Sequence, residues 1–209
     1  MSTLQAKTNR GGRSTRDAII DAASRLILVK GYSATSVDDV LRESSVGKGN
    51  FYHYFKSKED LAYAILNRVV RTFLDRTLEP CFSDPTLSRV SQIRCFLDHL
   101  VSHQRDSACV GGCMMGNLAS ELSDVHEGFR ATLADVFGHW RTRLTTALVE
   151  GQERGEVGAR CNPAVVAQFL VASLEGAILM TKLTKDIGVM EQCVAELKQY
   201  LSLYSGDAR

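Results

Sequence analysis

A run of aromatic and cationic side chains in the first third of the chain has the composition of a nucleic-acid contact. Between Lys48 and Phe55 four of eight residues are aromatic, and lysines lie before and after the run. A short helix that enters the major groove needs small or polar residues near its start, groups behind them that reach phosphates, and an apolar opposite face. Phe51 and Phe55, four residues apart, are predicted to anchor this helix. The predicted outward-facing residues are Lys48, Asn50, Tyr52 and His53.

Polar residues on both sides of this run are placed for phosphate contacts. Thr35 is predicted to cap the preceding short helix, and Ser36 starts its first turn. Lys58 lies in the first turn of the helix that follows. The alternative is that Tyr52, His53 and Tyr54 are core aromatics, which leaves the flanking lysines without a role.

A cysteine at a predicted helix start is the second candidate for chemistry. Gly111 and Gly112 break one helix and place Cys113 at or near the N-terminus of the next. The helix dipole and the free backbone amides there lower the pKa of a thiol, so Cys113 is the predicted reactive thiol among the six cysteines. Cys109 is close enough to act as its resolving partner. The alternative is a small buried hydrophobe, the usual environment of a free cysteine.

Charged residues on an apolar C-terminal helix form a third candidate site. Glu175 and Lys182 are seven residues apart, hence on one face, and can serve one pocket. The alternative is a hydrogen-bonded Glu175 inside a helix bundle and a solvated Lys182. Trp140 is a possible pocket wall. His99 and His103 have the spacing of a metal-binding pair, but no second pair accompanies them, so we predict pocket or surface histidines, no metal site and no cofactor.

Helical periodicity covers nearly the whole chain and predicts the elements that position these residues. No alternating strand pattern and no internal repeat is present, so the predicted fold is all-α with about nine or ten helices. Residues 1–60 are predicted to hold a basic arm and a three-helix DNA-binding domain with a helix-turn-helix, and residues 61–209 a helical domain for ligand sensing and dimerisation. The predicted helices lie near 14–30, 36–44, 47–53, 58–79, 87–104, 113–122, 126–152, 163–185 and 189–204, with a loop at 81–85.

Composition supports a globular protein with one basic end. The 209 residues are 44% hydrophobic and 23% charged, which excludes a disordered or fibrous chain. Residues 1–60 carry ten Lys/Arg against seven Asp/Glu, whereas the remainder carries 15 against 17, so the N-terminal end is expected to meet a polyanion. No secretory signal and no uninterrupted membrane-spanning segment is found. We therefore expect a cytoplasmic protein with free thiols and no membrane partner.

Residues 14–62 strongly resemble the tetracycline-repressor (TetR/AcrR) family of bacterial transcriptional regulators. The resemblance rests on a helix closed by glycine, a capped short helix, the sequence VGKGNFYHYF at 46–55 and KSKEDL at 56–61. It implies a homodimer on a palindromic double-stranded operator and a C-terminal domain for a small-molecule effector. Arg10, Arg13 and Arg16 are further candidates for contacts from the arm. The family's usual DNA contacts fall on Thr35, Ser36, Lys48, Gly49, Asn50, Tyr52, His53 and Lys58.

Two C-terminal segments resemble a subgroup of this family, which includes the repressor of the N-ethylmaleimide reductase operon and an acrylate-responsive repressor. The segments lie at about residues 105–130 and 170–186. The resemblance implies that Cys113 senses electrophiles or oxidants, that Lys182 can pair with it, and that this region surrounds a small-acid pocket. The resemblance to the family as a whole implies a four-helix dimer interface, for which residues 126–152 and 163–185 are the candidates.

Two functions of other classes compete with the regulator. One is a helical thiol-dependent enzyme with Cys113 as nucleophile, assisted by Glu175 and Lys182. The chain has no nucleophile elbow, phosphate loop, zinc-protease motif or dinucleotide fingerprint, so we predict no catalytic residues. The other is a protein-interaction module in which the helix-turn-helix binds a protein partner. Salt-dependent affinity for duplex DNA would distinguish a regulator from such a module.

Overall fold

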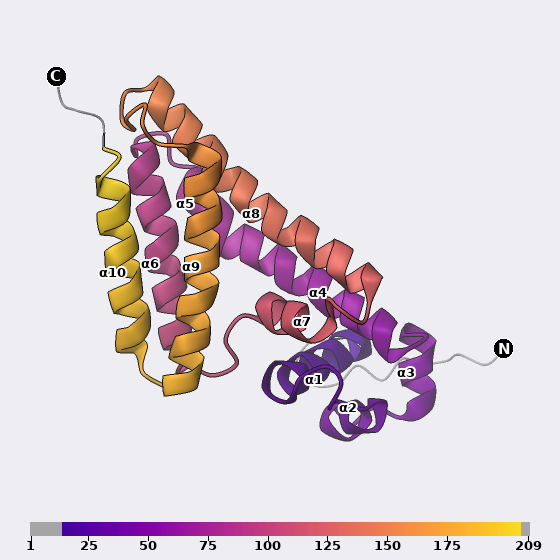
Figure 1. Ribbon diagram of the computed structural model, residues 1–209. Coiled ribbons are helices and arrows are strands. Elements are labelled where there is room, and N and C mark those ends of the chain that lie inside the picture. Colours follow the sequence, from indigo (N-terminus) through magenta and orange to yellow (C-terminus); the bar gives the residue numbers. More distant parts are fainter. Residues whose placement is uncertain (1–13, 206–209) are drawn as a thin grey trace. The chain divides into compact units, whose positions relative to one another are not determined.

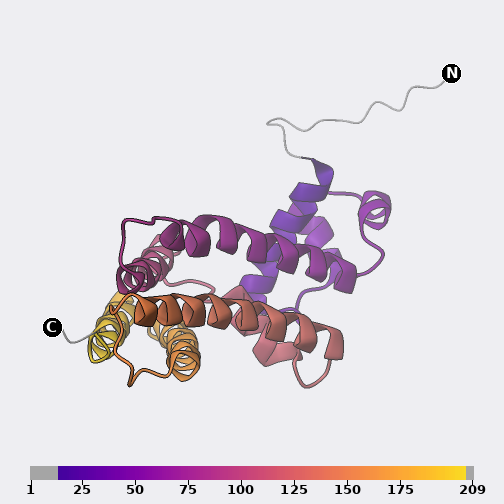
Figure 2. The same cartoon turned by 90° about the horizontal axis from the view of Figure 1, so that it is seen from above.

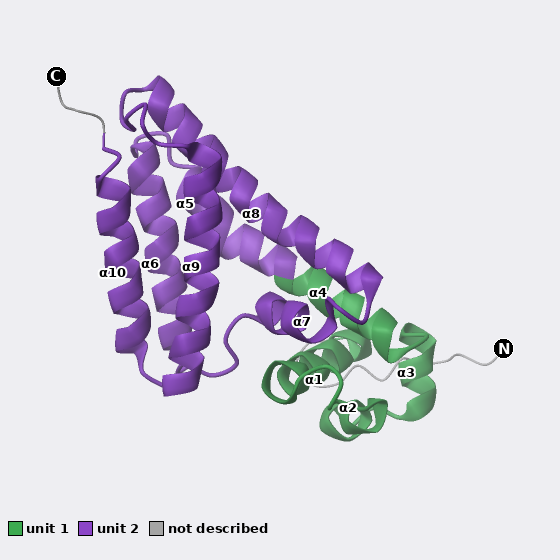
Figure 3. Ribbon diagram, in the orientation of Figure 1, with its two compact units in different colours: residues 1–69 green, residues 70–209 purple. Residues whose placement is uncertain are grey.

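The structure of the chain, a computed structural model, describes residues 14–205 and divides into two compact units (Figures 1 and 3). Unit 1 comprises residues 1–69 and unit 2 residues 70–209, so the division falls within a helix rather than at residues 60/61 as expected. The described residues form ten α-helices and one short π-helix, with a single isolated bridge between Val157 and Ser205. The all-α prediction is confirmed. The predicted arm, with Arg10 and Arg13, lies outside the described residues.

Unit 1 contains α1 (Thr15–Lys30), α2 (Val37–Ser44), α3 (Lys48–Tyr54) and the first part of α4 (Lys58–Phe73). Gly31 closes α1 with a φ of 92°, a conformation in which glycine has no steric penalty. Its amide donates to the carbonyl of Ile27 at 2.9 Å.

The N-cap of α2 differs from the prediction. Ser36, and not Thr35, caps the helix, because the Ser36 hydroxyl accepts from the amide of Asp39 while the Asp39 carboxylate accepts from the amide of Ser36. This reciprocal capping box satisfies two backbone donors at once. Thr35 is fully buried, and its hydroxyl donates to the carbonyl of Gly31 at 2.7 Å. Thr35 therefore ties the loop to the end of α1.

Apolar side chains from all four helices form the core of unit 1. Phe51 and Phe55 are buried as predicted, with ring centroids 5.9 Å apart. Burial of such side chains is the main source of stability in a small helical unit. Since both anchors of α3 point inward, the orientation of its opposite face is fixed. The other core residues of unit 1 are Ile19, Ile20, Ala22, Ala23, Ile27, Val40, Leu61, Ala62, Ile65 and Leu66.

The chain stays helical past Pro80, where a loop was predicted. The last residues of α4 lead into a π-helix, η1 (Leu74–Leu78), and then into α5 (Glu79–Phe82). Pro80 is the second residue of α5, which directly follows the π-helical turn. The predicted loop at 81–85 is therefore wrong at Cys81 and Phe82, both of which are helical and buried.

Unit 2 is built around four long helices. They are α6 (Arg89–Asp106), α8 (Glu127–Glu153), α9 (Pro163–Thr184) and α10 (Ile187–Ser202). The helices α6 and α8, α8 and α9, α9 and α10, and α10 and α6 pack against each other, which closes a ring (Figures 1 and 2). The short helix α7 (Met114–Leu122) packs on α8. Trp140 lies inside, stacked on Phe73 with centroids 4.2 Å apart.

One face of α9 is apolar and exposed. Its exposed positions follow a spacing of four and three residues, the repeat of a helix that packs against another helix. By length and composition α9 is the one helix of the described chain long enough and apolar enough to cross a membrane, and 44% of the relevant window is buried in the fold. The exposed residues in this repeat are Val165, Phe169, Ala172, Gly176, Leu179 and Leu183.

Candidate functional site

The outer face of α3 presents polar and aromatic groups to solvent. Lys48, Asn50, Tyr52 and His53 are all exposed, as the sequence predicted, while Phe51 between them is buried. The Tyr52 ring lies edge-on against Phe51 at 5.2 Å, which holds it at the surface. The face thus combines a cation, an amide, a phenol and an imidazole, which are the donors that contact phosphates and base edges.

No packing contact within the described part of unit 1 requires glycine at position 49. Gly49 lies inside α3, and a Cβ added there would meet nothing within 4 Å. Glycine inside a helix costs roughly 0.5–1 kcal/mol relative to alanine. Close approach of an external surface, such as a DNA backbone, explains the residue better than internal packing does.

Three other predicted DNA contacts already have partners inside unit 1. The buried Thr35 side chain is removed from the candidate set, because it cannot reach a ligand. Ser36 is exposed, and its hydroxyl is shared with Asp39, whose pKa is lowered mainly by that hydrogen bond. Lys58 donates to the carbonyl of Tyr32 at 3.0 Å, and its ammonium lies over the Tyr32 ring at 4.2 Å.

Unit 2 contains a cavity of about 420 Å³ between α7, α8 and α9. Its volume is that of a small-molecule site. Cys113, Glu175 and Lys182 all line it, so the structure brings together the two segments singled out by the sequence. Sequence reasoning missed the other lining residues, among them Asn117, which lies one helical turn after Cys113. The remaining lining residues are Gly112, Gly116, Ala119, Ser120, Phe137, Gln168, Val171, Ala172, Gly176, Ile178 and Leu179.

Two lysines at the end of α9 contact α7 and the loop before it. Lys182 Nζ donates to Asn117 Oδ1 at 3.1 Å, and Lys185 Nζ donates to the carbonyl of Cys109 at 3.1 Å. Gly112 has a φ of 72°, and a Cβ there would come within 3.0 Å of the Lys182 side chain. Lys182 is therefore in direct contact with the segment that carries Cys113.

The position of Cys113 is as predicted, but its predicted acidity is wrong. Cys113 is the N-cap of α7, and its sulfur accepts from the amide of Gly116 at 3.4 Å. Burial, however, raises the pKa of the thiol, and the neighbouring carboxylate of Glu175 raises it further, against a smaller lowering by the amides. Desolvation and a like charge outweigh the helix terminus. The thiol form therefore dominates at neutral pH.

Glu175 is itself in an unusual environment. Burial raises the pKa of its carboxyl group, while the contact with Cys113 lowers it. Its Oε1 has no hydrogen-bond partner among the described residues. A buried oxygen without a partner is costly, so a donor from a bound ligand would stabilise this arrangement. A Cβ on Gly116 would collide with the other carboxylate oxygen, so any larger residue there would require the Glu175 side chain to move.

The remaining predicted pocket residues do not line the cavity. Cys109 is buried in the loop before α7, and Trp140 belongs to the core. His103 is exposed on α6, and His99 faces α5 rather than His103. Both histidines are at the surface, one of the two predicted environments, and His99 Nδ1 contacts the sulfur of Cys81 at 3.2 Å.

Replacing Glu175 with glutamine is expected to make Cys113 more reactive. Loss of the nearby negative charge lowers the thiol pKa, so the thiolate fraction at fixed pH rises about tenfold for each pH unit by which that pKa falls. The measurement is the rate of iodoacetamide labelling of Cys113 between pH 8 and 10, read by peptide mass spectrometry with Cys193 as internal reference. Glu153→Gln, at an exposed carboxylate on α8, should leave the rate unchanged. Equal rates in wild type and Glu175→Gln would contradict the assigned cause.

Family models match most of the chain. Residues 19–65 match the model described as "Bacterial regulatory proteins, tetR family". Residues 90–197 match "Tetracyclin repressor-like, C-terminal domain". The first match spans α2, α3 and most of α1, and the second spans most of unit 2, including every residue that lines the cavity.

Several bacterial regulators are similar over most of their length. The transcriptional regulator AcuR of Cereibacter sphaeroides is 33% identical over 166 residues, 79% of this chain and 75% of that protein. An HTH-type regulator from the lacX 3′ region of Lactococcus lactis is 32% identical over 179 residues, 86% and 89% of the two chains. The HTH-type repressor NemR of Escherichia coli is 26% identical over 188 residues, 90% and 94% of the chains. The crystal structure of its reduced form superposes with a TM-score of 0.79, covering 90% of this chain and 96% of that one.

Proposed function

This chain belongs to the TetR family of bacterial transcriptional regulators, and we propose that it is a cytoplasmic, homodimeric repressor that a small effector releases from a palindromic operator. Repression, as opposed to activation, is supported by relatives that are named as repressors, such as NemR and DhaR. The alternatives, a thiol enzyme and a protein-interaction module, have no comparable support.

The exposed face of α3 is the observation that carries this proposal. Lys48, Gly49, Asn50, Tyr52 and His53 form the proposed reading surface, and Ser36 with Lys58 the flanking phosphate contacts. In a dimer two such helices would read half-sites about one helical turn apart, ~34–36 Å. The aromatic and amide groups would orient the helix, and Lys48 would supply salt-dependent affinity.

The exposed stripe of α9 is the proposed dimer interface. Large apolar groups that remain uncovered in one chain are typical of surfaces that a partner covers. Ala172 and Gly176 lie in the middle of the stripe, and a Cβ on Gly176 would meet nothing within 4 Å. A second helix approaching closely explains a glycine at that position.

The cavity of unit 2 is the proposed effector site. It shares Ala172, Gly176 and Leu179 with the α9 stripe, so a ligand there would alter the surface that the partner subunit contacts. A 100-fold change in operator affinity needs a coupling free energy of only about 2.7 kcal/mol. The raised pKa of Cys113 favours a reversible ligand over rapid alkylation, while oxidation or electrophile addition at Cys113, with Lys182 beside it, is the second candidate signal.

Selection of duplexes from a random library tests the proposal. The wild-type protein is expected to enrich one two-fold symmetric sequence, which is then titrated at several salt concentrations. Small carboxylic acids such as acrylate, and separately hypochlorite and N-ethylmaleimide, are added to wild type and to Cys113→Ser. Release of wild type alone by thiol reagents assigns the signal to Cys113, and equal release of both variants by an acid assigns it to the cavity. Failure to enrich any duplex would contradict the proposed function.

A further inference from the structure

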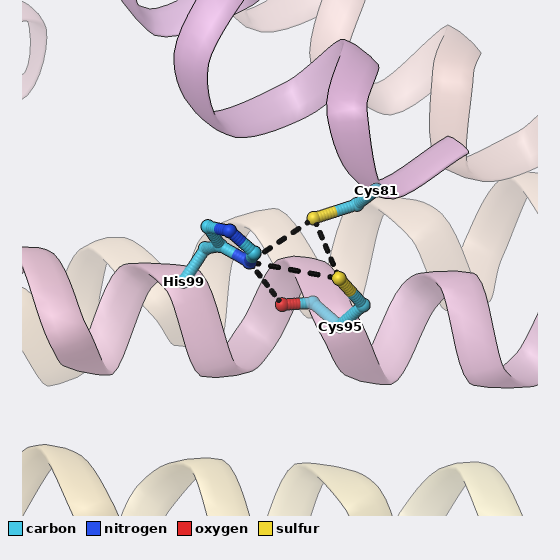
Figure 4. A group of neighbouring side chains, drawn as sticks. All are labelled: Cys81, Cys95 and His99. Carbon is cyan, nitrogen blue, oxygen red and sulfur yellow. Dashed lines mark hydrogen bonds between the residues drawn. The ribbon is translucent and has the colours of Figure 1, made fainter. Parts of the chain in front are cut away.

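Two cysteines and a histidine meet where α5 packs on α6, on elements that line no part of the effector cavity (Figure 4). Cys81 comes from α5, and Cys95 and His99 lie one turn apart on α6. The two sulfurs are 2.9 Å apart, and His99 Nδ1 lies 3.2 Å from the sulfur of Cys81 and 3.6 Å from that of Cys95. All three ligand atoms lie within 4.8 Å of one another.

The exposure of the three side chains increases from the interior to the surface. Cys81 is buried, Cys95 is half-buried and His99 is exposed. An ion can therefore reach the sulfurs past the imidazole, and a water molecule can complete its coordination. His99 Nδ1 points at both sulfurs and also contacts the carbonyl of Cys95 at 3.0 Å, so the donor atom already faces the place an ion would occupy (Figure 4).

The spacing suits a tetrahedral ion after a small movement. Zinc binds sulfur at about 2.3 Å and imidazole nitrogen at about 2.0–2.1 Å, so tetrahedral ligand atoms lie roughly 3.5–3.8 Å apart. Two of the three distances are shorter than this, 2.9 Å between the sulfurs and 3.2 Å between His99 Nδ1 and the Cys81 sulfur, and separations of less than about 1 Å meet that geometry. Two thiolates and one imidazole are also the donor set that favours zinc over the hard cations.

We propose that Cys81, Cys95 and His99 bind one Zn²⁺ ion per chain, with water as the fourth ligand. Each thiol loses its proton to the solvent and gives a sulfur–zinc bond. The proton with which His99 Nδ1 bonds the Cys95 carbonyl is lost to the solvent while Nε2 takes one up, so the neutral imidazole binds the ion through its Nδ1 lone pair. Two thiolate charges balance the dication, so the site carries no net charge in its half-buried position. Because the ion links α5 to α6 across the loop at 83–88, zinc binding stabilises unit 2.

Metal titration of the reduced full-length protein tests this site. Zn²⁺ is added in competition with a chromogenic chelator, and Co²⁺ serves as a spectroscopic probe in a parallel titration. One ion per chain is expected, with a thiolate-to-cobalt charge-transfer band, tetrahedral d–d bands, and a melting temperature that rises with Zn²⁺. Loss of a single outer-sphere partner already costs about 10–100-fold in metal affinity, so Cys95→Ser and His99→Ala are each expected to weaken binding at least about tenfold.

Matched substitutions outside the cluster separate this site from adventitious binding. Cys193→Ser changes a half-buried cysteine on α10, and His103→Ala changes an exposed histidine one turn further along α6. Both should bind Zn²⁺ like wild type. The exposed position of His99 makes His99→Ala the variant that is safest for folding. Equal affinity in wild type and His99→Ala, a cobalt spectrum without thiolate charge transfer, or a Cys81–Cys95 pair that only forms a disulfide would overturn the proposal.

Discussion

The double variant Asn50→Ala/Tyr52→Ala is expected to bind the selected operator at least about 100-fold more weakly than wild type. A side-chain contact to a base edge contributes about 1–3 kcal/mol, and a dimer loses each contact twice. Both residues are exposed on α3 and neither is part of the core, so the fold should survive. Fluorescence anisotropy of a labelled duplex over a range of salt concentrations measures the loss.

The salt dependence of operator binding distinguishes the loss of base contacts from the loss of phosphate contacts. Asn50 and Tyr52 are neutral, so the double variant should keep the wild-type slope of log affinity against log salt. Lys48→Ala, on the same face, should reduce that slope by about one for each phosphate contact removed. Val29→Ala, at an exposed apolar residue of α1, should change neither quantity. A double variant that retains wild-type affinity would remove α3 from the proposed interface.

Unit 1 was predictable from sequence because its signals are local. Glycine after α1, acidic residues in the first turn of α2 and the four-residue spacing of Phe51 and Phe55 each report a feature within one or two turns. The error at Thr35 shows the limit of such signals. Both Thr35 and Ser36 can cap a helix, and the choice depended on the carbonyl of Gly31, which only the folded loop brings within reach of Thr35.

The properties of unit 2 depend on packing between segments far apart in the sequence. A cysteine at a helix start predicts a lowered pKa, yet Glu175, 62 residues later, and the surrounding burial reverse the shift. His99 was considered with His103 on the same helix, whereas its sulfur partner Cys81 lies on α5. The spacing of Cys95 and His99, four residues apart, was the local signal that could have located the cluster.

Leu183→Glu is expected to raise the dissociation constant of the dimer at least about 1000-fold, which corresponds to about 4 kcal/mol. Leu183 is 72% exposed in the single chain and ends the α9 stripe, so the substitution costs the monomer little. A two-fold interface contains the change twice, and each carboxylate would be buried without a partner. Sedimentation velocity over a range of protein concentrations measures the shift. Val125→Glu, at a 77% exposed valine between α7 and α8, is the matched control and should remain dimeric.

The two variants together distinguish loss of operator recognition from loss of dimerisation. Leu183→Glu leaves α3 unchanged, so its monomer should keep weak, salt-dependent affinity for any duplex while losing the tight binding that requires two half-sites. Asn50→Ala/Tyr52→Ala should remain a dimer and lose sequence preference. A Leu183→Glu protein that stays dimeric would place the interface elsewhere than the α9 stripe. A monomeric Leu183→Glu protein with full operator affinity would instead show that one chain suffices to read the site.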